Sequence, residues 1–334
     1  MTLNIIHTGL EKCYDLSGRE IPCHGTCQDA AFRSGVPWPA SRFTSLSKKR
    51  VRDELTGLEW TLKANFFDFP LTWQQALDEV KEMNRGGFDG YNDWRLPNRR
   101  EMRSVVSHGQ RKPALPADHP FTGVFLGWYW TSTTSALARA YAWYVHLEGA
   151  RMFYGGKEQR YLAWPVRGSS VHIPRTGQTE CFNTRGEVIE CAGTGQDPDI
   201  SAGQSWPAPR FSRLGHEVTD HLTSRVWLDP VVFAGRAVNW QEALDLAQRL
   251  TGGKDWRLPN INELESLVDA SAHSPALPQG HPFTGLMDGY WSSTTSFFEP
   301  DWAYVLYMRK GAVGVGYKPG VEFYTWPVRC LDRG

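Results

Sequence analysis

Residues 93–98 read Asp-Trp-Arg-Leu-Pro-Asn, and residues 255–260 repeat all six in the same order. Other motifs recur around them without any change of order, and a repeated set of this kind marks a tandem duplication. We therefore predict two homologous domains, residues 1–170 and 171–334. The recurring motifs are Pro-Ala-Leu-Pro at 113–116 and 275–278, His-Pro-Phe-Thr-Gly at 119–123 and 281–285, and Trp-Pro-Val-Arg at 164–167 and 326–329.

Each repeat is predicted to contain two helices that begin at capping-box pairs. From Tyr129 and Tyr290 onward, aromatic, small and β-branched residues alternate between Gly-containing turns, which predicts an antiparallel meander closed by the Trp-Pro-Val-Arg strand. The predicted fold class is α+β, with two helices packed on a small, twisted antiparallel sheet with long loops in each domain. The capping pairs are Thr72 with Gln75, Asn98 with Glu101, Asn239 with Glu242, and Asn260 with Glu263.

Four of the six cysteines form two matched pairs. Cys13 and Cys23 are separated by a ten-residue step, and Cys181 and Cys191 repeat it, each with a Gly midway. This spacing predicts a disulfide that closes a hairpin in each repeat. A zinc site is disfavoured, because no CxxC or His pair accompanies these cysteines.

The other two cysteines, Cys27 and Cys330, have no counterpart in the opposite repeat, and a bond between them would join the two ends of the chain. Disulfides predict an extracytoplasmic protein: secreted, on the cell surface or periplasmic. Residues 1–6 lack the basic and long apolar regions of a signal peptide. We expect a mature form without its signal; the alternative is a cytosolic protein with reduced cysteines.

Composition excludes some classes of partner. The 36 basic and 36 acidic residues give a formal net charge of +0, so no global field attracts nucleic acid or an anionic membrane. No apolar run approaches the roughly 20 residues of a transmembrane helix. The 15 Trp and 12 Tyr residues indicate large core residues, ligand-stacking surfaces or both.

The ordered motifs carry a family likeness. Cys-Tyr-Asp at 13–15, Thr-Trp-Gln-Gln-Ala-Leu at 72–77, Tyr-Trp-Thr-Ser-Thr-Thr at 129–134 and the two motifs at 93–98 and 164–167 together resemble the Lcl C-terminal domain family, named after the Legionella collagen-like adhesin. The resemblance covers nearly the whole chain, once per repeat. It implies a C-type-lectin-like fold and a surface or secreted protein, and some relatives bind sulfated glycans or act as adhesins.

The sequence also departs from other proteins of that fold. The Glu-Pro-Asn or Gln-Pro-Asp loop of calcium-dependent lectins is missing, and residues 92–94 have Asn-Asp-Trp in the wrong order for their Trp-Asn-Asp strand. The cysteine pair of formylglycine-generating enzymes, whose Arg-Leu-Pro-Asn segment looks similar, is also missing. Neither calcium-bridged sugar binding nor formylglycine synthesis is therefore implied.

The candidate ligand-binding residues lie in the aromatic meanders, because aromatic faces stack on sugar rings or side chains and Lys donates to hydroxyl, sulfate or carboxylate groups. Strand alternation means that about half of them should face the core instead. The candidates are Trp128, Tyr141, Trp143, Tyr154 and Lys157 in the first repeat, and Trp302, Tyr304, Tyr317 and Lys318 in the second.

Two recurring pairs have both a functional and a structural interpretation. Arg95 with Glu101, and Arg257 with Glu263, would either line a site or form a structural ion pair, and the structural interpretation is favoured because a buried Arg needs a partner. The histidines of the His-Pro-Phe-Thr-Gly motif would be a metal ligand, a general base or the donor of a loop-fixing hydrogen bond. The hydrogen bond is favoured, since no second ligand recurs at a suitable spacing.

Two other segments invite chemistry. The Thr-rich strands at 131–134 and 292–295 contain hydroxyl groups that would serve as a nucleophile. A catalytic role is disfavoured, because no Gly-x-Ser-x-Gly motif is present and Thr is common in strands. Asp197 and Asp199 would hold a structural calcium or, as we favour, stabilise a turn. We therefore predict no enzyme, no catalytic residue and no cofactor, with calcium as the one open alternative.

The predicted function is binding: a secreted or cell-surface lectin-like or adhesin-like protein that recognises a glycan or another protein through aromatic loops. The first alternative is a self-assembling subunit of an extracellular filament or sheath, with the aromatic residues buried at subunit contacts. An enzyme acting on an extracellular polymer ranks last.

Overall fold

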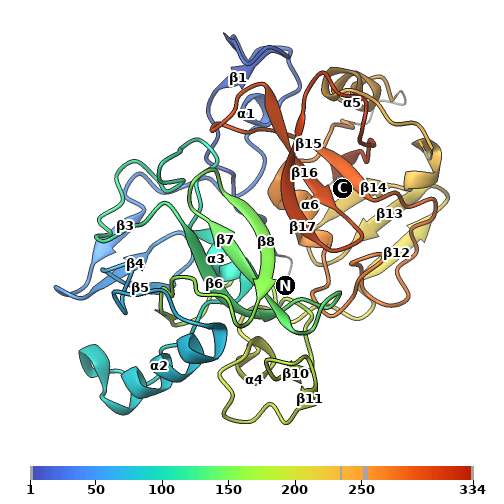
Figure 1. Ribbon diagram of the computed structural model, residues 1–334. Coiled ribbons are helices and arrows are strands. Elements are labelled where there is room, and N and C mark those ends of the chain that lie inside the picture. The colour runs from blue at the N-terminus through green and yellow to red at the C-terminus, as the bar shows by residue number, and fades with distance from the viewer. Residues whose placement is uncertain (1–2, 234, 251–254, 332–334) are drawn as a thin grey trace. The chain divides into compact units, whose positions relative to one another are not determined.

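The computed structural model describes residues 3–233, 235–250 and 255–331, and it is a mixed α/β protein with short helices and several small antiparallel sheets (Figure 1). The chain forms two compact units. Unit 1 combines residues 1–37 with residues 206–334, and unit 2 is the continuous stretch 38–205. The compact units therefore differ from the contiguous repeats 1–170 and 171–334, because the first segment of each repeat packs with the later part of the other.

Unit 2 holds two sets of strands, two main helices and a small hairpin subdomain. Its elements are β3 (Phe43–Ser45), β4 (Arg50–Asp53), β5 (Glu59–Thr61), α2 (Trp73–Arg85), η1 (Phe88–Gly90), α3 (Arg99–Ser104), β6 (Trp128–Thr134), β7 (Tyr141–His146), β8 (Arg151–Gly156), β9 (Val166–Arg167), β10 (Cys181–Phe182), β11 (Val188–Ile189) and α4 (Asp197–Ile200).

Unit 1 contains a counterpart of each of these strands and α-helices, with its hairpin in residues 1–37. Its elements are β1 (Cys13–Tyr14), β2 (Glu20–Ile21), α1 (Asp29–Phe32), β12 (Phe211–Leu214), β13 (Glu217–Asp220), β14 (Arg225–Leu228), η2 (Pro230–Phe233), α5 (Trp240–Gln248), α6 (Ile261–Leu267), β15 (Gly289–Thr295), β16 (Trp302–Tyr307), β17 (Ala312–Tyr317) and β18 (Val328–Cys330). Its 3-10 helix η2 precedes α5, whereas η1 follows α2.

The predicted meanders are present as β6-β7-β8 and β15-β16-β17, antiparallel throughout. The Trp-Pro-Val-Arg strands do not close them, contrary to the prediction. Strand β9 pairs with β5, and β18 pairs with β14, so that each motif completes a separate four-stranded sheet. A strand this late in each repeat reaches back to the first strands, which a local pattern cannot reveal.

The helices begin where the capping residues predict. Three of the four predicted capping boxes are complete, at Thr72, Asn98 and Asn260. At Asn239 the side chain accepts from the amide of Glu242, but the Glu242 carboxylate pairs with Arg236 instead of reaching back to the cap. The apolar faces of α2 and α5 are buried, and each packs a Trp, an Ala and a Leu against its meander.

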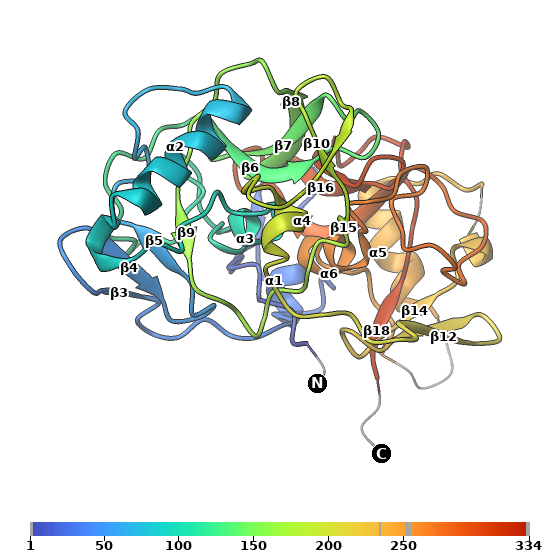
Figure 2. The ribbon, with the colours of Figure 1, turned by 90° about the horizontal axis from the view of Figure 1, so that it is seen from below.

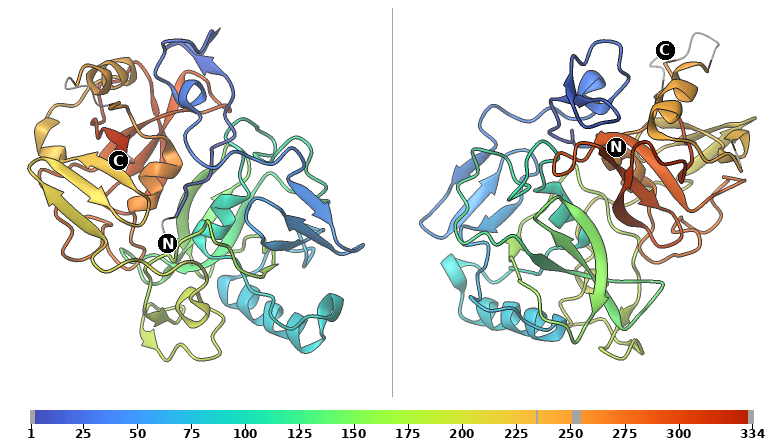
Figure 3. Two further views of the ribbon diagram at one scale, coloured as in Figure 1. Left: turned by 180° about the vertical axis from the view of Figure 1, so that it is seen from behind. Right: turned by 45° about the horizontal axis from the view of Figure 1, so that its top comes forward.

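Both predicted hairpin disulfides are present, Cys13–Cys23 and Cys181–Cys191. The Cys27–Cys330 bond, which the sequence left open, is not formed: Cys27 is a buried free thiol and Cys330 an exposed one. Figure 2 shows α4, which belongs to the segment 168–205 that carries the second disulfide hairpin, beside β6 of unit 2. Figure 3 shows the first hairpin segment, in blue, against the orange-red strands of unit 1, where α1 contacts β15.

Among the described residues, no helix has the length and apolar character needed to cross a membrane.

Candidate functional site

The recurring Arg–Glu pairs form buried ion pairs, as the structural interpretation predicts. Arg95 pairs with Glu101 in unit 2. In unit 1, Arg257 donates Nη1 and Nη2 to the two carboxylate oxygens of Glu263 at 2.7 and 2.6 Å. Because Glu101 and Glu263 also accept from the N-cap amides of α3 and α6, each pair fixes the start of a helix against a sheet.

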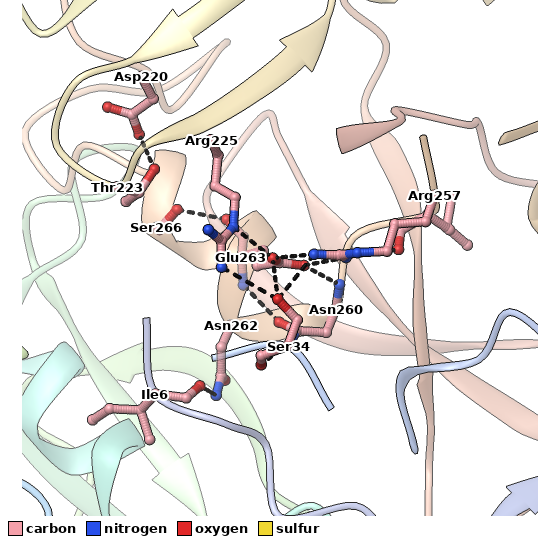
Figure 4. Close-up of polar contacts among 11 residues, drawn as sticks. Ile6, Ser34, Asp220, Thr223, Arg225, Arg257, Asn260, Asn262, Glu263 and Ser266 are labelled. Carbon is pink, nitrogen blue, oxygen red and sulfur yellow. Dashed lines mark hydrogen bonds and ion pairs between the residues drawn. The ribbon is translucent and has the colours of Figure 1, made fainter. Parts of the chain in front are cut away.

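Unit 1 adds a second Arg to this arrangement (Figure 4). Arg225 donates Nε to Glu263 at 2.8 Å, and the hydroxyl of Ser34 contacts Glu263 and both Arg side chains. Burial alone would raise the pKa of Glu263, but Arg257 and Arg225 hold that pKa far below its usual range. The carboxylate therefore stays ionised, and its role is to neutralise two cations.

A pocket of about 340 Å³ opens beside Arg225, lined otherwise by residues 4–5 and 35–37. It carries one charged side chain, and that side chain already donates to Glu263 and Ser34. A free cation would be needed to attract an anion there, so the pocket is a poor anion site.

Four of the nine candidate ligand residues are buried, which corrects the prediction for them. Trp143 is 1% exposed and Tyr304 is 2% exposed, and both face the interior of their meanders. Lys157 and Lys318 are 0% exposed, because each ammonium group turns inward and donates to two backbone carbonyls of a disulfide hairpin. None of the four can reach a ligand in the folded protein.

The other five candidates remain accessible. Trp128, Tyr141 and Tyr317 are exposed, and Tyr154 and Trp302 are partly exposed. Tyr141 and Tyr154 meet edge to face at 6.0 Å, and Trp302 lies 5.5 Å from Tyr317. The accessible candidates thus include one small ring pair on each unit.

A partly exposed cluster of aromatic rings surrounds Trp128 at the start of β6. We call Trp128, Tyr144, His146 and Tyr161 the Trp128 surface. The Trp128 indole stacks on His146, with ring centres 5.1 Å apart and planes at 17°, and it lies 5.6 Å from Tyr161. Tyr144 supports both neighbours at 6.4 Å from Trp128 and 5.0 Å from Tyr161.

This surface combines exposure with a fixed geometry. Trp128 is 46% exposed although three rings contact it, and the neighbouring Phe125 and Leu126 are also exposed. Burial is the main cause that lowers the pKa of His146, so the stacked imidazole is neutral at neutral pH. An uncharged aromatic face whose rings pack on one another suits the apolar face of a sugar ring or an aliphatic side chain.

The sequence did not single out three members of this surface. Residue type and strand alternation alone do not distinguish Tyr144, His146 and Tyr161 from residues that face the core. The usable signal is divergence at matched positions: Trp128, His146 and Tyr161 correspond to Gly289, Tyr307 and Phe323. Position 128 is Trp where position 289 is Gly, while the Tyr-Trp pair that follows is the same in both repeats. The two units therefore differ here at their surface, while the core residues beside it are retained.

The other polar candidates serve the fold. Asp197 Oδ2 accepts from Thr133 and Thr176 at 2.7 Å each, and Asp199 accepts from the amides of Gly193 and Gly195. Asp199 therefore stabilises a turn, as favoured from the sequence, whereas the Asp197 side chain joins the hairpin segment to β6. In the described part of the chain, no group of three or more His, Cys, Asp or Glu residues has metal-binding geometry.

The loop-fixing hydrogen bond predicted for the two recurring histidines is not formed at Nδ1. In the described ranges, His119 Nδ1 and His281 Nδ1 are buried without a hydrogen-bond partner. Each ring instead packs on the Phe two residues later, at 5.9 and 6.0 Å. Burial lowers the pKa of both histidines, so the rings act as neutral packing groups.

The fold and its surface define a tandem-repeat mixed α/β protein with a disulfide hairpin in each unit and one prominent aromatic face. The sequence matches the Lcl C-terminal domain over residues 49–167 and again over residues 216–329. The chain belongs to that family, with two tandem copies of the domain. Both disulfide hairpins lie outside the matched ranges. No curated protein matches the chain.

Proposed function

We propose that this chain is an extracytoplasmic, lectin-like binding protein that holds a glycan on the Trp128 surface, and that it is not an enzyme. The observation that carries the proposal is the half-exposed Trp128 indole stacked at 5.1 Å on His146. Immobilising rings in advance lowers the conformational entropy cost of binding. The family resemblance further supports a C-type-lectin-like fold for each domain and a surface or secreted location.

Polar groups beside the rings suit hydroxyl-bearing ligands. The hydroxyl of Tyr161 donates to Gln159 Oε1 at 2.9 Å, and Arg160 donates to Gln75 nearby. Hydroxyl and amide groups at the edge of an aromatic face pair with sugar hydroxyls, while the face itself covers the sugar's C–H groups. Two disulfides fit a protein that folds in an oxidising compartment.

The test is a glycan array, including sulfated polysaccharides, probed with the oxidised wild-type protein and with Trp128→Ala. Removing a central aromatic anchor typically costs 2 kcal/mol or more, so we expect affinity to fall by about 30-fold or more. Tyr317→Ala is the matched control, because Tyr317 is also 46% exposed but lies in unit 1. Binding that persists in Trp128→Ala would contradict the assignment of this surface.

Binding should also persist in EDTA, since the proposal uses no metal. An array without any signal would favour the second candidate, a subunit of an extracellular assembly. In that case the exposed stretch from Phe125 to Trp128 would be covered by another protein, as exposed apolar patches commonly are.

A further inference from the structure

The two hairpins are exchanged between the repeats. The first hairpin segment, residues 1–37, begins the first repeat but packs in unit 1 with the strands and helices of residues 206–334. The second hairpin segment, residues 168–205, packs in unit 2 with the elements of residues 38–167. The chain passes from one unit to the other at positions 37/38 and 205/206, immediately before the Trp-Pro pair of each repeat.

Both hairpins are held by the same buried lysine contact. Lys318 Nζ donates to the carbonyls of Tyr14 and Asp15 at 3.3 and 3.2 Å. Lys157 Nζ donates to the carbonyls of Phe182 and Asn183 at 3.0 and 3.1 Å. Each ammonium also lies about 4 Å above the ring of the first helical Trp of α5 or α2.

A buried aspartate makes a second matched contact. Asp29 Oδ2 accepts from Thr294 of β15 at 2.8 Å, and Asp197 Oδ2 accepts from Thr133 of β6 at 2.7 Å. A third contact is also shared, because the N-cap side chains of α6 and α3 donate to hairpin carbonyls at 3.3 Å. Each unit thus holds its hairpin through three matched contacts, and unit 1 adds the contacts of Ser34 with Arg225, Arg257 and Glu263.

The tethers of the two hairpins differ. The second hairpin segment is joined to residues of the other described elements on both sides, at 167/168 and at 205/206. The first hairpin segment, which we call the arm, is joined to residues 38–334 at 37/38 alone. The arm is bound to its own chain's acceptor by non-covalent contacts alone, which also include Leu3 N to Leu222 O at 2.8 Å and Asn262 Nδ2 to Ile6 O at 2.9 Å. Every one of these contacts would be identical if the acceptor belonged to another copy.

We propose that the surface of residues 206–334 also accepts the arm of a second copy of this chain, so that two chains dimerise by exchanging residues 1–37. Exchange of an identical element needs no new interface chemistry. Tethering favours the intramolecular form up to effective concentrations in the millimolar range. The exchanged dimer therefore accumulates when the chain refolds at high concentration and is then trapped by the buried contacts.

The experiment uses the full chain with its disulfides intact, unfolded in guanidinium and refolded at about 1 µM and at about 500 µM, below and near the effective concentration of a tethered segment. Light scattering after size exclusion measures the mass. We expect monomer at the low concentration and, at the high one, a dimer fraction at least about tenfold larger that persists for hours after dilution. Monomer at both concentrations would overturn the proposal.

Two locked variants identify the element that is exchanged. Asp29→Cys with Thr294→Cys, oxidised before refolding, ties the arm to its own acceptor and should abolish the dimer. Asp197→Cys with Thr133→Cys ties the second hairpin in the same way and should leave the dimer fraction at the wild-type level. Dimer formation by the arm-locked chain at the wild-type level would overturn the proposal.

Discussion

Units 1 and 2 use the same contacts to hold their hairpins but present different surfaces at the start of their meanders. The Lys–carbonyl, Asp–Thr and Arg–Glu contacts all occur twice. At the first position of the meander, however, unit 2 exposes Trp128, and unit 1 has Gly289 covered by Phe323. Residues that hold the frame are constrained by their partners, whereas an exposed ring can be gained or lost without disturbing them.

The largest expected effect separates the two Arg–Glu clusters. Glu263→Ala leaves both Arg257 and Arg225 without their carboxylate, while Glu101→Ala leaves only Arg95. Breaking a buried pair by removing one partner costs about 3–5 kcal/mol, so we expect about 5 kcal/mol for Glu263→Ala and about 3 for Glu101→Ala. Guanidinium unfolding of both variants measures the difference.

Glu263→Gln is the control for side-chain volume and should keep most of the loss, because an amide does not neutralise the two cations. Equal losses of unfolding free energy in Glu101→Ala and Glu263→Ala would show that Arg225 does not add to the destabilisation caused by removing the Glu263 carboxylate.

The second effect concerns pH and should be equal in the two units. Burial raises the pKa of Asp29 and of Asp197 to about 6, against the hydrogen bonds from Thr that lower it. At pH values between the unfolded-state pKa of 3.8 and the folded-state pKa of about 6, the native state binds more protons than the unfolded state. Each carboxyl therefore stabilises the fold more at pH 4 than at pH 7, by up to about 3 kcal/mol.

Asp29→Asn and Asp197→Asn remove this titration. The stability of each variant relative to wild type should rise between pH 4 and pH 7 by a similar amount, measured by unfolding at both pH values. A variant whose stability follows that of wild type across this range would contradict the assigned burial of its carboxylate.

The third effect tests why unit 1 lacks an aromatic surface. A Cβ atom at Gly289 would lie 2.3 Å from Phe323 Cδ1, so Gly289→Ala overpacks this site. Overpacking costs about 1–3 kcal/mol, and we expect about 2. Phe323→Leu in the Gly289→Ala background should recover part of the loss in thermal unfolding. An unchanged Tm in Gly289→Ala would mean that the strand face of unit 1 is free to accept a side chain.

The smallest effect lies at Ser34, which has Ala202 as its counterpart in unit 2. Its hydroxyl donates to Glu263 at 3.0 Å and accepts from Arg225 and Arg257. Ser34→Ala should cost about 1–2 kcal/mol, the value of hydrogen bonds to charged groups, in the same unfolding assay. If Ser34→Ala lowered the free energy of unfolding by more than Glu263→Ala does, Ser34 and not Glu263 would be the main stabilising residue of this cluster.

The local features of the fold could be predicted from the sequence. Capping boxes at Thr72, Asn98 and Asn260 depend on residues three apart, and the hairpin disulfides depend on a ten-residue step. Both are decided within a single turn or hairpin, so a one-dimensional pattern contains them. The recurring Arg–Glu pair was likewise correctly interpreted as structural, because a buried Arg requires a partner.

The non-local features could not be predicted. Nothing in residues 1–37 indicates that they pack with residues 206–334, because either domain offers the same contacts. Lys157 and Lys318 were candidate hydrogen-bond donors to a ligand, yet hairpin carbonyls distant in sequence hold them inside. The Trp128 surface depends on ring contacts between strands and a loop, so strand alternation alone did not separate it from buried Trp143.

The most direct test of the hairpin exchange compares two fragments of similar length, residues 38–205 and residues 1–170. The first is a complete compact unit with its docked hairpin. The second is a complete sequence repeat whose hairpin, residues 1–37, docks on residues 206–334 in the full chain and is joined to the opposite end of residues 38–167 from the hairpin that docks there. The account predicts that oxidised 38–205 unfolds in one cooperative thermal transition as a monomer, while 1–170 shows no such transition as a monomer. A monomeric 1–170 fragment that unfolds cooperatively at the same Tm as 38–205 would contradict it.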